Sequence, residues 1–393
     1  MNKPIKQHLI DPEICIRCHS CEAACPIGAI EHDDTNVVVK ADACNFCMAC
    51  IPVCPTGSID EWRIVDAPYT LAEQYGWSEL PAQQPLEAAE AEVEAVDAGV
   101  AALLEDAHAG AGGRMRPPAS ASKPTVNMYT PAKPVEATVQ GNYRLTAESS
   151  DADVRHIILN FEGQPFPVLE GQSLGVIAPG LDAQGRAHLP RLFSVSSPRD
   201  GERPNFNNVS LTVKRESDGV CSNYLCDLGK GDKVKITGPF GATFLMPNDA
   251  EARLLMICTG TGAAPFRAFT MRRQRLDARG GDMVLFFGAR APDSLPYFGP
   301  LNKIPNRQLR KHLVYSRIPG APKEYVQDRL LVECDDVAEM LGDGRTHIYI
   351  CGLRGMEQGV EKSFISICES VGVSWAALRD ALREQGRYHV ETY

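Results

Sequence analysis

Two stretches near the N-terminus, CIRCHSCEAACP at residues 15–26 and CNFCMACIPVCP at residues 44–55, carry the same pattern. In each, gaps of two, two and three residues separate four cysteines, and a proline follows the last one. Two-residue gaps let three sulfurs from one tight loop wrap a single cluster, so the fourth ligand has to come from elsewhere. The eight cysteines are Cys15, Cys18, Cys21, Cys25, Cys44, Cys47, Cys50 and Cys54. The repeat predicts a small domain that is organised around metal ligands.

The spacing favours iron–sulfur clusters over zinc sites or disulfides. A zinc site closes with four ligands as two CxxC pairs and needs no third cysteine two residues further on. Eight of the fourteen cysteines lie between Cys15 and Cys54, and such a dense run in a cytosolic chain usually binds metal. Residues 1–63 resemble the bacterial two-cluster ferredoxins over their whole length.

In that two-cluster pattern, the fourth ligand of each cluster comes from the other copy of the run. One [4Fe–4S] cluster is therefore expected on Cys15, Cys18, Cys21 and Cys54. The second [4Fe–4S] cluster is expected on Cys44, Cys47, Cys50 and Cys25. A domain this small can bury little apolar core, so the clusters should also help to hold the fold together.

Length and charge narrow the class of protein. The chain has 393 residues, of which 44% are hydrophobic, and can fill more than one core. Its net charge of -10 and the lack of a long basic run argue against nucleic acid or an anionic membrane as the main partner. No apolar stretch approaches the ~20 residues that a membrane span needs, and we do not expect the residues after Met1 to act as a secretory signal. A cytoplasmic protein is expected.

The composition divides the chain into four parts and predicts a multidomain fold. Residues 1–63 form the predicted α+β ferredoxin domain, and residues 64–134 are an Ala/Glu/Pro-rich linker. In residues 135–248, short strands broken by Gly, Pro and Asn predict a small antiparallel β-barrel. In residues 249–393, apolar strands alternate with helical segments, which predicts an α/β domain with a parallel sheet.

The linker contains one periodic segment. Residues 80–109 hold seven acidic residues and no Lys or Arg. The apolar residues recur at steps of three and four, as in an amphipathic helix: Leu86, Ala89, Val93, Val96, Val100, Leu103 and Ala107. This helix is either a plain acidic spacer or a surface that docks one redox domain on the other. The proline-rich residues 114–134 are expected to be flexible or extended.

Residues 191–197, RLFSVSS, combine groups that a flavin can use: an arginine for the pyrophosphate, an aromatic ring for stacking and hydroxyls for the N5 edge. Alone, this string is weak evidence, since most such strings are ordinary strands. Four further segments surround it in order: VLEGQSLGVI (168–177), VSLTVKR (209–215), GVCSNYL (219–225) and KITGPFG (235–241). Together they resemble the plant-type ferredoxin–NADP⁺ reductase family, from residue 135 to Tyr393.

This resemblance implies a set of contacts to FAD. Side chains expected beside the flavin are Arg191, Leu192, Phe193, Ser194, Thr212, Val213 and Lys214. Backbone N–H groups expected to hold the pyrophosphate belong to Val220, Cys221 and Ser222. The family usually has tyrosine where this chain has Phe193. Stacking survives that change, but the hydrogen bond of the phenol does not, so flavin affinity is the property that it affects.

The strand LLMIC (254–258) leads into TGTGAAPFR (259–267). Glycines after a strand let the backbone approach a pyrophosphate, and the next helix points its positive end at it. The third glycine of the dinucleotide fingerprint is missing, so the pattern alone is a weak match. It is, however, the form that the resemblance implies, and it places Gly260, Thr261 and Gly262 beside NADPH.

Four residues after the strand at 313–315 suit the 2′-phosphate of NADPH, which needs cationic and hydroxyl donors. They are Ser316, Arg317, Lys323 and Tyr325, and the resemblance implies that Tyr325 stacks on adenine. An exposed Ser-Arg pair is otherwise an ordinary surface feature. A strictly NAD-dependent enzyme more often places an acid at this position.

The remaining site residues come from the resemblance. Cys351, Gly352 and Leu353 follow the strand at 347–350 and are implied to border the nicotinamide, although a buried cysteine is more often inert packing. The terminal Tyr393 is implied to cover the flavin and to move aside for nicotinamide. Glu391 is expected near Ser194 and the hydride path. The predicted catalytic residues are Ser194, Cys351, Glu391 and Tyr393.

These features together predict an electron-transfer enzyme. NADPH delivers two electrons as hydride, a [4Fe–4S] cluster accepts one, and a flavin can divide the pair. The arrangement of ferredoxin, acidic linker and reductase resembles the reductase components of aerobic aromatic-epoxidase systems. It implies a separate oxygenase partner with a di-iron site that epoxidises benzoyl-CoA, and a homo-oligomer is possible. The alternatives are a general NADPH–ferredoxin oxidoreductase with a built-in ferredoxin and a non-catalytic redox sensor.

Overall fold

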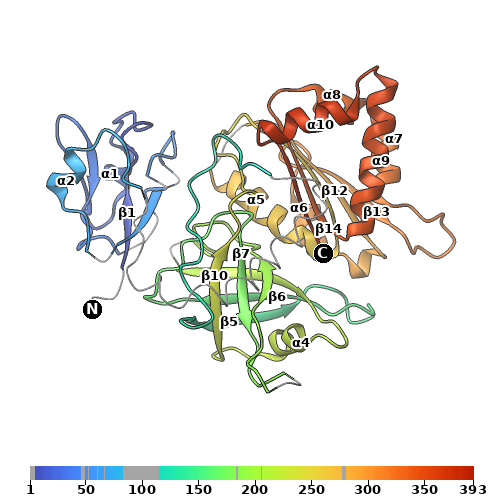
Figure 1. Cartoon of the computed structure of the whole chain (residues 1–393), viewed down its shortest axis with the longest axis horizontal. Coiled ribbons are helices and arrows are strands. Elements are labelled where there is room, and N and C mark those ends of the chain that lie inside the picture. The colour runs from blue at the N-terminus through green and yellow to red at the C-terminus, as the bar shows by residue number, and fades with distance from the viewer. Residues whose placement is uncertain are drawn as a thin grey trace.

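Three folded units follow one another along the chain (Figure 1). The structure, a computed structural model, describes residues 5–45, 49–51, 53–59, 61–65, 67–82, 115–182, 185–204, 206–276 and 280–393. We call residues 5–82 the cysteine-rich unit, residues 135–248 the antiparallel-sheet unit and residues 249–393 the parallel-sheet unit. Among the helices within these ranges, none has the length and apolar character that a membrane crossing requires.

The cysteine-rich unit is built from short elements. They are β1 (Ile5–Leu9), α1 (Ser20–Ala24), β2 (Ile30–His32), β3 (Val37–Val39), β4 (Glu61–Val65) and α2 (Leu71–Tyr75). Strand β1 pairs antiparallel with β4, and β2 pairs antiparallel with β3. The buried cluster between them contains Cys21 and Cys50 beside aliphatic side chains such as Ile30 and Ile59. The cysteines are therefore part of this core.

Residues 67–82 belong to the cysteine-rich unit. The side chain of Gln74 bonds to both the N–H (3.1 Å) and the C=O (3.0 Å) of Val39. Asn36 donates to the carbonyl of Trp77 at 2.8 Å. The unit thus extends past residue 63, where composition placed its end, because a helix of one turn packs on β3. The amphipathic helix predicted at 86–107 lies outside the described residues.

The connecting segment, residues 115–134, runs over both reductase units without a helix. Asn127 and Tyr129 donate backbone hydrogen bonds to residues 239 and 238 of β10, at 2.8 and 2.9 Å. Met115 is buried in the core of the parallel-sheet unit and its sulfur accepts from the N–H of Val390. This part of the predicted linker is extended and is attached to the units that it crosses.

The antiparallel-sheet unit contains β5 (Val135–Arg144), β6 (Val154–Asn160), β7 (Ser173–Ile177), β8 (Arg191–Ser194), β9 (Asn208–Lys214), α4 (Val220–Asp227) and β10 (Lys233–Phe240). The strand order is β8-β7-β10-β5-β6-β9, and every pairing is antiparallel. Beyond β8, Val195 forms an isolated bridge with Leu211 of β9. The two edges of the sheet therefore meet at one point, which brings β8 and β9 to the same site.

The parallel-sheet unit contains β11 (Arg253–Thr259), η2 (Gly260–Gly262), α5 (Ala263–Arg275), β12 (Met283–Ala289), η3 (Pro292–Ser294), α6 (Phe298–Lys303), β13 (Arg310–Tyr315), α7 (Val326–Val332), α8 (Cys334–Gly342), β14 (Thr346–Gly352), α9 (Arg354–Ser370), α10 (Trp375–Glu384) and β15 (Tyr388–Thr392). All pairings in the order β13-β12-β11-β14-β15 are parallel. The strand order reverses between β11 and β14. In such sheets, ligands bind at the carboxyl ends of the strands beside this reversal.

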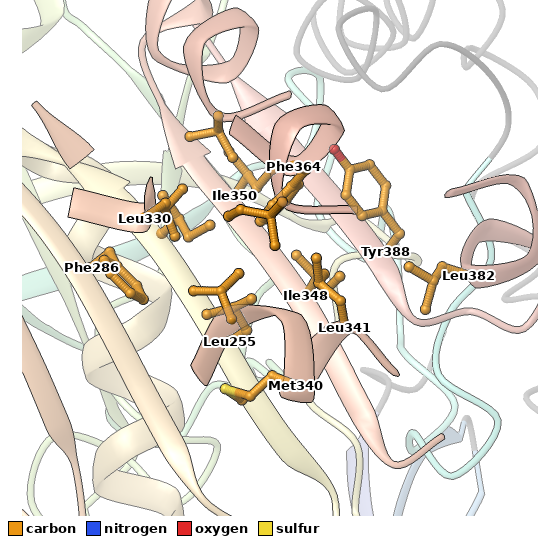
Figure 2. Close-up of a cluster of buried hydrophobic side chains, with 14 of the residues drawn as sticks. Leu255, Phe286, Leu330, Met340, Leu341, Ile348, Ile350, Phe364, Leu382 and Tyr388 are labelled. Atoms are coloured by element: carbon orange, nitrogen blue, oxygen red, sulfur yellow. The ribbon is translucent and has the colours of Figure 1, made fainter. Parts of the chain in front are cut away.

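Both faces of the parallel sheet are covered, as its continuous apolar strands require. Alternate residues of the strands, such as Leu255, Phe286 and Ile350, pack against α7, α8, α9 and α10 (Figure 2). The intervening residues, such as Met256 and Phe287, pack against α5. The large core fixes the strand ends independently of any ligand.

Candidate active site

Sulfur atoms from both cysteine runs approach each other. Cys25 from the first run lines one small cavity with Cys44 and Cys50 from the second. The Sγ of Cys25 also accepts a hydrogen bond from the N–H of Ala29 at 3.2 Å. Cys47 lies outside the described residues. This mixed set of thiols suits a thiolate-held cluster.

The other cysteines form a second group around Cys54. Burial and the nearby Cys54 raise the pKa of Cys21 to about 11. Burial would also raise the pKa of Cys54, but the hydroxyls of Ser58 and Thr56 and the backbone near Ile59 lower it. The sulfur of Cys54 interacts electrostatically with those of Cys18 and Cys21, and the sulfur of Cys21 interacts with that of Cys15. Hydroxyl and amide donors aimed at sulfur are the contacts that stabilise a negatively charged cluster.

Trp62 lies where the cysteine-rich unit meets the antiparallel-sheet unit. Its ring stacks on His8, with the ring centroids 3.9 Å apart, and His8 Nδ1 lies 4.0 Å from Cys50 Sγ. Trp62 also lines a small cavity together with Lys123 of the connecting segment and Val168 of the antiparallel-sheet unit. An aromatic pair therefore links a cysteine sulfur to the neighbouring unit.

The N-terminus of α4 has the features of a pyrophosphate site. Its first three residues are Val220, Cys221 and Ser222, whose N–H groups have no partner within a helix. A side chain at Gly219, the N-cap, would bring its Cβ within 2.3 Å of Ser222 Oγ. Burial raises the pKa of Cys221 to about 12, and the positive charge of the nearby Arg191 opposes that shift. The predicted arginine thus lies close to the free N–H groups.

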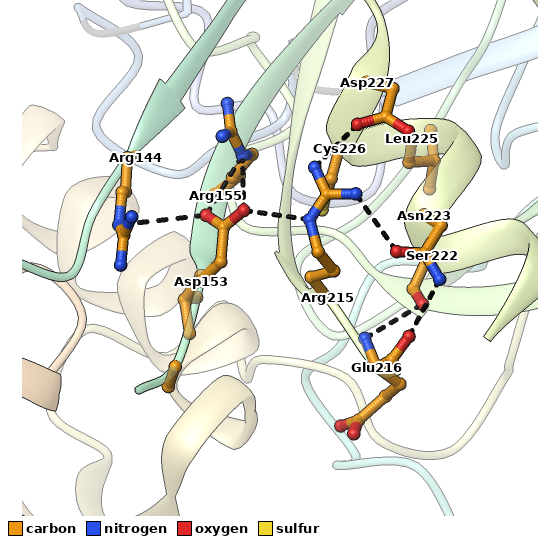
Figure 3. A network of polar contacts seen from close by, with 12 residues as sticks. Arg144, Asp153, Arg155, Arg215, Glu216, Ser222, Asn223, Leu225, Cys226 and Asp227 are labelled. Carbon is orange, nitrogen blue, oxygen red and sulfur yellow. Dashed lines mark hydrogen bonds and ion pairs between the residues drawn. The ribbon is translucent and has the colours of Figure 1, made fainter. Parts of the chain in front are cut away.

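A polar network holds the loop between β9 and α4 (Figure 3). The Asp153 carboxylate accepts from Nε of both Arg155 and Arg215 at 3.0 Å. Arg215 in turn donates to Asn223 at 3.0 Å, and Asn223 donates to the carbonyl of Gly219 at 3.0 Å. The Ser222 hydroxyl also donates to that carbonyl and accepts from the N–H of Glu216.

The other predicted flavin residues lie on β8 and β9. Phe193 and Ser194 are half-buried, and Phe193 packs against the core of the unit. Leu192 is also half-buried, Val213 is fully buried, and Lys214 pairs with Glu216 at 2.6 Å. The structure therefore places these residues on one pair of neighbouring strands, because the bridge from Val195 to Leu211 joins the two edges.

Thr212 leads to a buried polar network that the sequence did not reveal. Its hydroxyl lies 2.6 Å from the hydroxyl of Tyr297, which also bonds to His156 Nδ1 at 3.0 Å. Arg267 binds the Glu202 carboxylate with two hydrogen bonds of 2.7 Å. Burial would raise the pKa of Glu202, but hydrogen bonds from His156 and Arg267 hold it well below its usual range. The network joins the antiparallel-sheet unit to the parallel-sheet unit.

The predicted dinucleotide loop lies at the strand reversal. Gly260 has φ = 56°, which glycine adopts without strain. A Cβ on Gly262 would lie 2.1 Å from the carbonyl oxygen of Cys351. The loop after β11 therefore contacts the end of β14 so closely that only glycine fits.

The C-terminal strand brings the predicted catalytic residues to this loop. In β15, Glu391 lies opposite Cys351 of β14. The Tyr393 N–H donates to the carbonyl of Gly352 at 3.0 Å, and its hydroxyl lies 2.6 Å from Thr261 Oγ1. The residue as a whole is 57% exposed, while burial of its phenol raises the pKa of Tyr393 above the usual range.

Cys351 is fully buried. Burial and the neighbouring Glu391 raise its pKa well above the usual range, which disfavours the thiolate form. The adjacent Leu353 is exposed at the start of α9.

The predicted 2′-phosphate residues surround the ends of β12 and β13. Arg317, Lys323 and Tyr325 are exposed, and Ser316 is half-buried. The N–H of Arg317 donates to the carbonyl of Arg290 at 2.8 Å. Arg290 is an exposed cation that the sequence analysis missed. Its position directly after β12 could have identified it, because neighbouring parallel strands end at the same edge.

Known proteins resemble two separate parts of this chain. Residues 256–362 match the oxidoreductase NAD-binding domain, and residues 7–55 match a 4Fe-4S dicluster domain. The ferredoxin–NADP reductase of the Cyanophora paradoxa cyanelle is 38% identical over 288 residues, covering 68% of this chain and 79% of that protein. The Spirulina sp. enzyme is 37% identical over 288 residues and is covered over 98% of its length.

Solved structures agree with this match. The ferredoxin-NADP⁺ reductase from Plasmodium falciparum superimposes with a TM-score of 0.56 and 25% identity, over 68% of this chain and 99% of that chain. The same enzyme with 2′P-AMP gives a TM-score of 0.55 and 25% identity. These relatives are ferredoxin–NADP reductases by name, which confirms the enzyme interpretation over the non-catalytic sensor. The chain belongs to the ferredoxin–NADP reductase family and carries a 4Fe–4S dicluster ferredoxin domain ahead of its reductase part.

Proposed function

We propose that the protein passes electrons from NADPH, through FAD and two [4Fe–4S] clusters, to a separate oxygenase component. In this proposal the oxygenase is a di-iron epoxidase that acts on benzoyl-CoA in the aerobic degradation of aromatic compounds. One observation carries the electron-transfer part. The same chain brings Tyr393 to Thr261 at the strand reversal of the parallel sheet and holds two groups of cysteine sulfurs.

The residues at the strand reversal and at the ends of β12 and β13 have separate roles in this proposal. Backbone groups of residues 260–262 hold the nucleotide pyrophosphate, while Ser316, Arg317 and Lys323 bind the 2′-phosphate and Tyr325 covers the adenine. Arg290 adds a further positive charge at the same edge. The likeness to a reductase that was solved with 2′P-AMP supports this placement.

The flavin has its own set of contacts. Arg191 and the first turn of α4 hold its pyrophosphate, and Phe193 stacks on its ring. Bound FAD supplies the conversion of a two-electron hydride into single electrons. Tyr393, anchored by Thr261 and by the backbone of Gly352, covers the place that nicotinamide takes, while Ser194 and Glu391 border the path of the hydride.

Electrons leave the reductase part toward the cysteine-rich unit. The pair of His8 and Trp62 supports a route, because it connects the sulfur of Cys50 with the surface of the antiparallel-sheet unit. The assignment of the clusters follows the crossed pattern, with Cys25 beside Cys44 and Cys50, and with Cys54 beside Cys21.

The oxygenase partner is supported by the order of the domains alone. A complete reductase that carries its own ferredoxin has no need of a separate carrier, and so it suits direct delivery to a terminal acceptor. The test combines the purified protein with NADPH, O₂, benzoyl-CoA and a di-iron benzoyl-CoA oxygenase, and measures epoxide formation. NADPH oxidation without epoxide would refute the partner and leave the reductase intact.

A matched variant separates the two parts of the proposal. Cys44→Ser removes a predicted cluster ligand and leaves the flavin contacts untouched. We expect the variant to reduce ferricyanide with NADPH at the parent rate and to lose epoxidation. Equal epoxidation by parent and variant would show that the electrons do not pass through this cluster.

The second candidate is a general NADPH–ferredoxin oxidoreductase with a built-in ferredoxin. The printed names of the relatives favour it, because they are ferredoxin–NADP reductases. It predicts efficient reduction of unrelated soluble ferredoxins, whereas the oxygenase proposal predicts efficient reduction of one partner.

A further inference from the structure

Three side chains that are separate from the eight cysteines converge on the surface of the cysteine-rich unit. They are His19 at the N-cap of α1, Glu22 within α1, and His32 at the end of β2 (Figure 1 for the helix). His32 Nδ1 lies 2.8 Å from Glu22 Oε2, and His19 Nδ1 lies 3.4 Å from the same oxygen. All three ligand atoms fall within 4.8 Å of one another.

The local fold brings these groups together with the backbone of His19 in an unfavourable conformation. His19 has φ = 56°, a left-handed conformation that few residues other than glycine adopt and that disfavours the folded state unless its surroundings impose it. The imidazole rings of His19 and His32 lie 4.0 Å apart. His19 and Glu22 lie three positions apart in sequence, a spacing that puts side chains on one face of a helix turn.

One atom of the group lacks a hydrogen-bond partner. His19 Nδ1 is hidden from solvent and has no hydrogen-bond partner among the described residues. Its contact with Glu22 has the length of an ion pair only. A hidden ring nitrogen without a partner requires an explanation, and an ion bound at the nitrogen is one such explanation.

The donor set selects a class of ion. Two imidazole nitrogens and one carboxylate oxygen suit zinc and its neighbours among the divalent transition metals, whereas Mg²⁺ and Ca²⁺ prefer oxygen alone. Ligand atoms around a tetrahedral zinc at ~2.0–2.1 Å lie roughly 3.3 Å apart. The 3.4 Å separation between His19 Nδ1 and Glu22 Oε2 already matches. The 2.8 Å separation between His32 Nδ1 and Glu22 Oε2 is a hydrogen bond that opens slightly when metal replaces the proton.

We propose that His19, Glu22 and His32 form a binding site for one divalent transition metal ion, with Zn²⁺ as its representative. The three side chains are 43%, 31% and 45% exposed, so an ion enters from solvent and a fourth position stays open to water. Lys40, the cation that interacts with Glu22, makes its ion pair with Glu31 at 2.7 Å. The bound ion ties α1 to β2 beside Cys18 and Cys21.

The test uses the full chain with its iron–sulfur clusters intact, freed of loosely bound metal by a chelator. Zn²⁺ is titrated by calorimetry, and zinc and iron are then counted after gel filtration. We expect one Zn²⁺ per chain with the iron content unchanged. Zinc uptake that is matched by iron loss would show that the cysteines bind it, and it would overturn the proposal.

Single substitutions locate the ion. His32→Ala and Glu22→Gln should weaken Zn²⁺ binding by more than about tenfold, since even outer partners of a metal site contribute that much. His19→Asn should do the same and keeps a residue that tolerates positive φ. The matched controls His188→Ala and Glu13→Gln should bind like the parent. Binding that survives His32→Ala would refute the site.

A measurement on the parent protein needs no variant. Diethyl pyrocarbonate modifies accessible imidazole nitrogens, and mass spectrometry locates the products. Zn²⁺ should protect His19 and His32 and leave His188 reactive. Equal modification of His19 and His32 with and without Zn²⁺ would overturn the proposal, whatever the variants show.

Discussion

The cysteine-rich unit and the parallel-sheet unit position their predicted functional groups in opposite ways. In the described part of the first unit, the functional cysteines belong to a core of eight buried residues. In the described part of the second, a core of twenty buried residues packs between the sheet and its helices together with Met115 of the connecting segment, and the predicted ligand contacts lie at strand ends and in loops. One site is built from the core itself, and the other is carried by a core that does not need the ligand.

This difference indicates in which unit a bound ligand contributes to the free energy of folding. A domain with a small core depends on its metal, because binding free energy adds directly to the free energy of folding. A domain with a large core binds its ligand with groups that are already in place. We therefore expect substitutions in the first unit to change the fold and substitutions in the second to change binding and turnover.

The largest effect is expected from Cys25→Ser. The side chain lies with Cys44 and Cys50 at one cavity, so its loss should remove the cluster of the second run and about half of the bound iron. The iron content and the EPR spectrum of the reduced protein measure this. NADPH-dependent reduction of ferricyanide should persist, because the reductase core is separate.

The control for this variant is Cys334→Ser, on α8 of the parallel-sheet unit, which should keep all its iron. Loss of only the other cluster, on Cys15, Cys18, Cys21 and Cys54, would show that the fourth ligands do not cross over. Loss of the reductase activity along with the iron would contradict the conclusion that the reductase units fold and act without the clusters.

Gly262→Ala should have the next largest effect. The new Cβ would lie 2.1 Å from the carbonyl oxygen of Cys351, so a backbone strand has to shift. We expect a loss of about 1–3 kcal/mol in the free energy of unfolding and a larger loss in NADP⁺ affinity, as measured by denaturation and titration. Gly342→Ala, where a Cβ meets open space, should leave both unchanged.

Arg317→Ala tests whether the parallel-sheet unit binds through groups that its fold does not need. The side chain is exposed, so stability should not change. A lost charge-assisted contact to phosphate contributes ~1.5–3 kcal/mol, which is roughly a ten- to hundredfold rise in KM for NADPH. The KM for NADH should change little. Equal changes for both nucleotides would exclude a role at the 2′-phosphate, and Arg307→Ala should change neither.

The smallest effect is expected from Tyr393→Ser. The ring is anchored at Thr261. If it covers the nicotinamide position, as we propose, its removal should tighten NADP⁺ binding several-fold and lower kcat. Tighter ground-state binding without a matching gain in the transition state slows turnover. Discrimination against NADH should also weaken. Titration with NADP⁺, followed by the flavin spectrum, measures this.

An affinity that equals that of the parent would show that Tyr393 does not cover the nicotinamide site. Tyr143→Ser removes a ring of similar exposure on β5, 58% against 57%, and serves as the control. Together the four variants order the effects from loss of a cluster to a shift in ligand affinity.

Much of the site could be read from short strings of sequence. The segments around Arg191, Cys221 and Gly262 are each contiguous, and their spacing reflects a local requirement: a strand end, a helix start or a close backbone approach. The network of His156, Glu202, Arg267 and Tyr297 could not be found this way. His156 lies on β6, Arg267 on α5, and Glu202 and Tyr297 in loops, so no local pattern marks them.

The limits of composition appear at the edges of the units. The one-turn helix α2 looked like linker because five residues carry too little periodicity to reveal a packed face. Gln74 of this helix is buried and forms hydrogen bonds to β3. The sequence around Gln74 does not predict these hydrogen bonds. Arg290 could not be predicted for a related reason, since the residue whose N–H donates to its carbonyl, Arg317, is twenty-seven positions away in the sequence.

The sequence by itself determined which chemistry the chain can carry, because ligand spacing and glycine positions are set by bond geometry within a few residues. It determined the two cysteine runs, the helix start that faces Arg191 and the loop at residues 260–262. Only the tertiary structure decided which of these groups meet. It brought Tyr393 to Thr261, Trp62 to the reductase surface and His19 to His32, since sheet order and packing set contacts between residues that are distant in the chain.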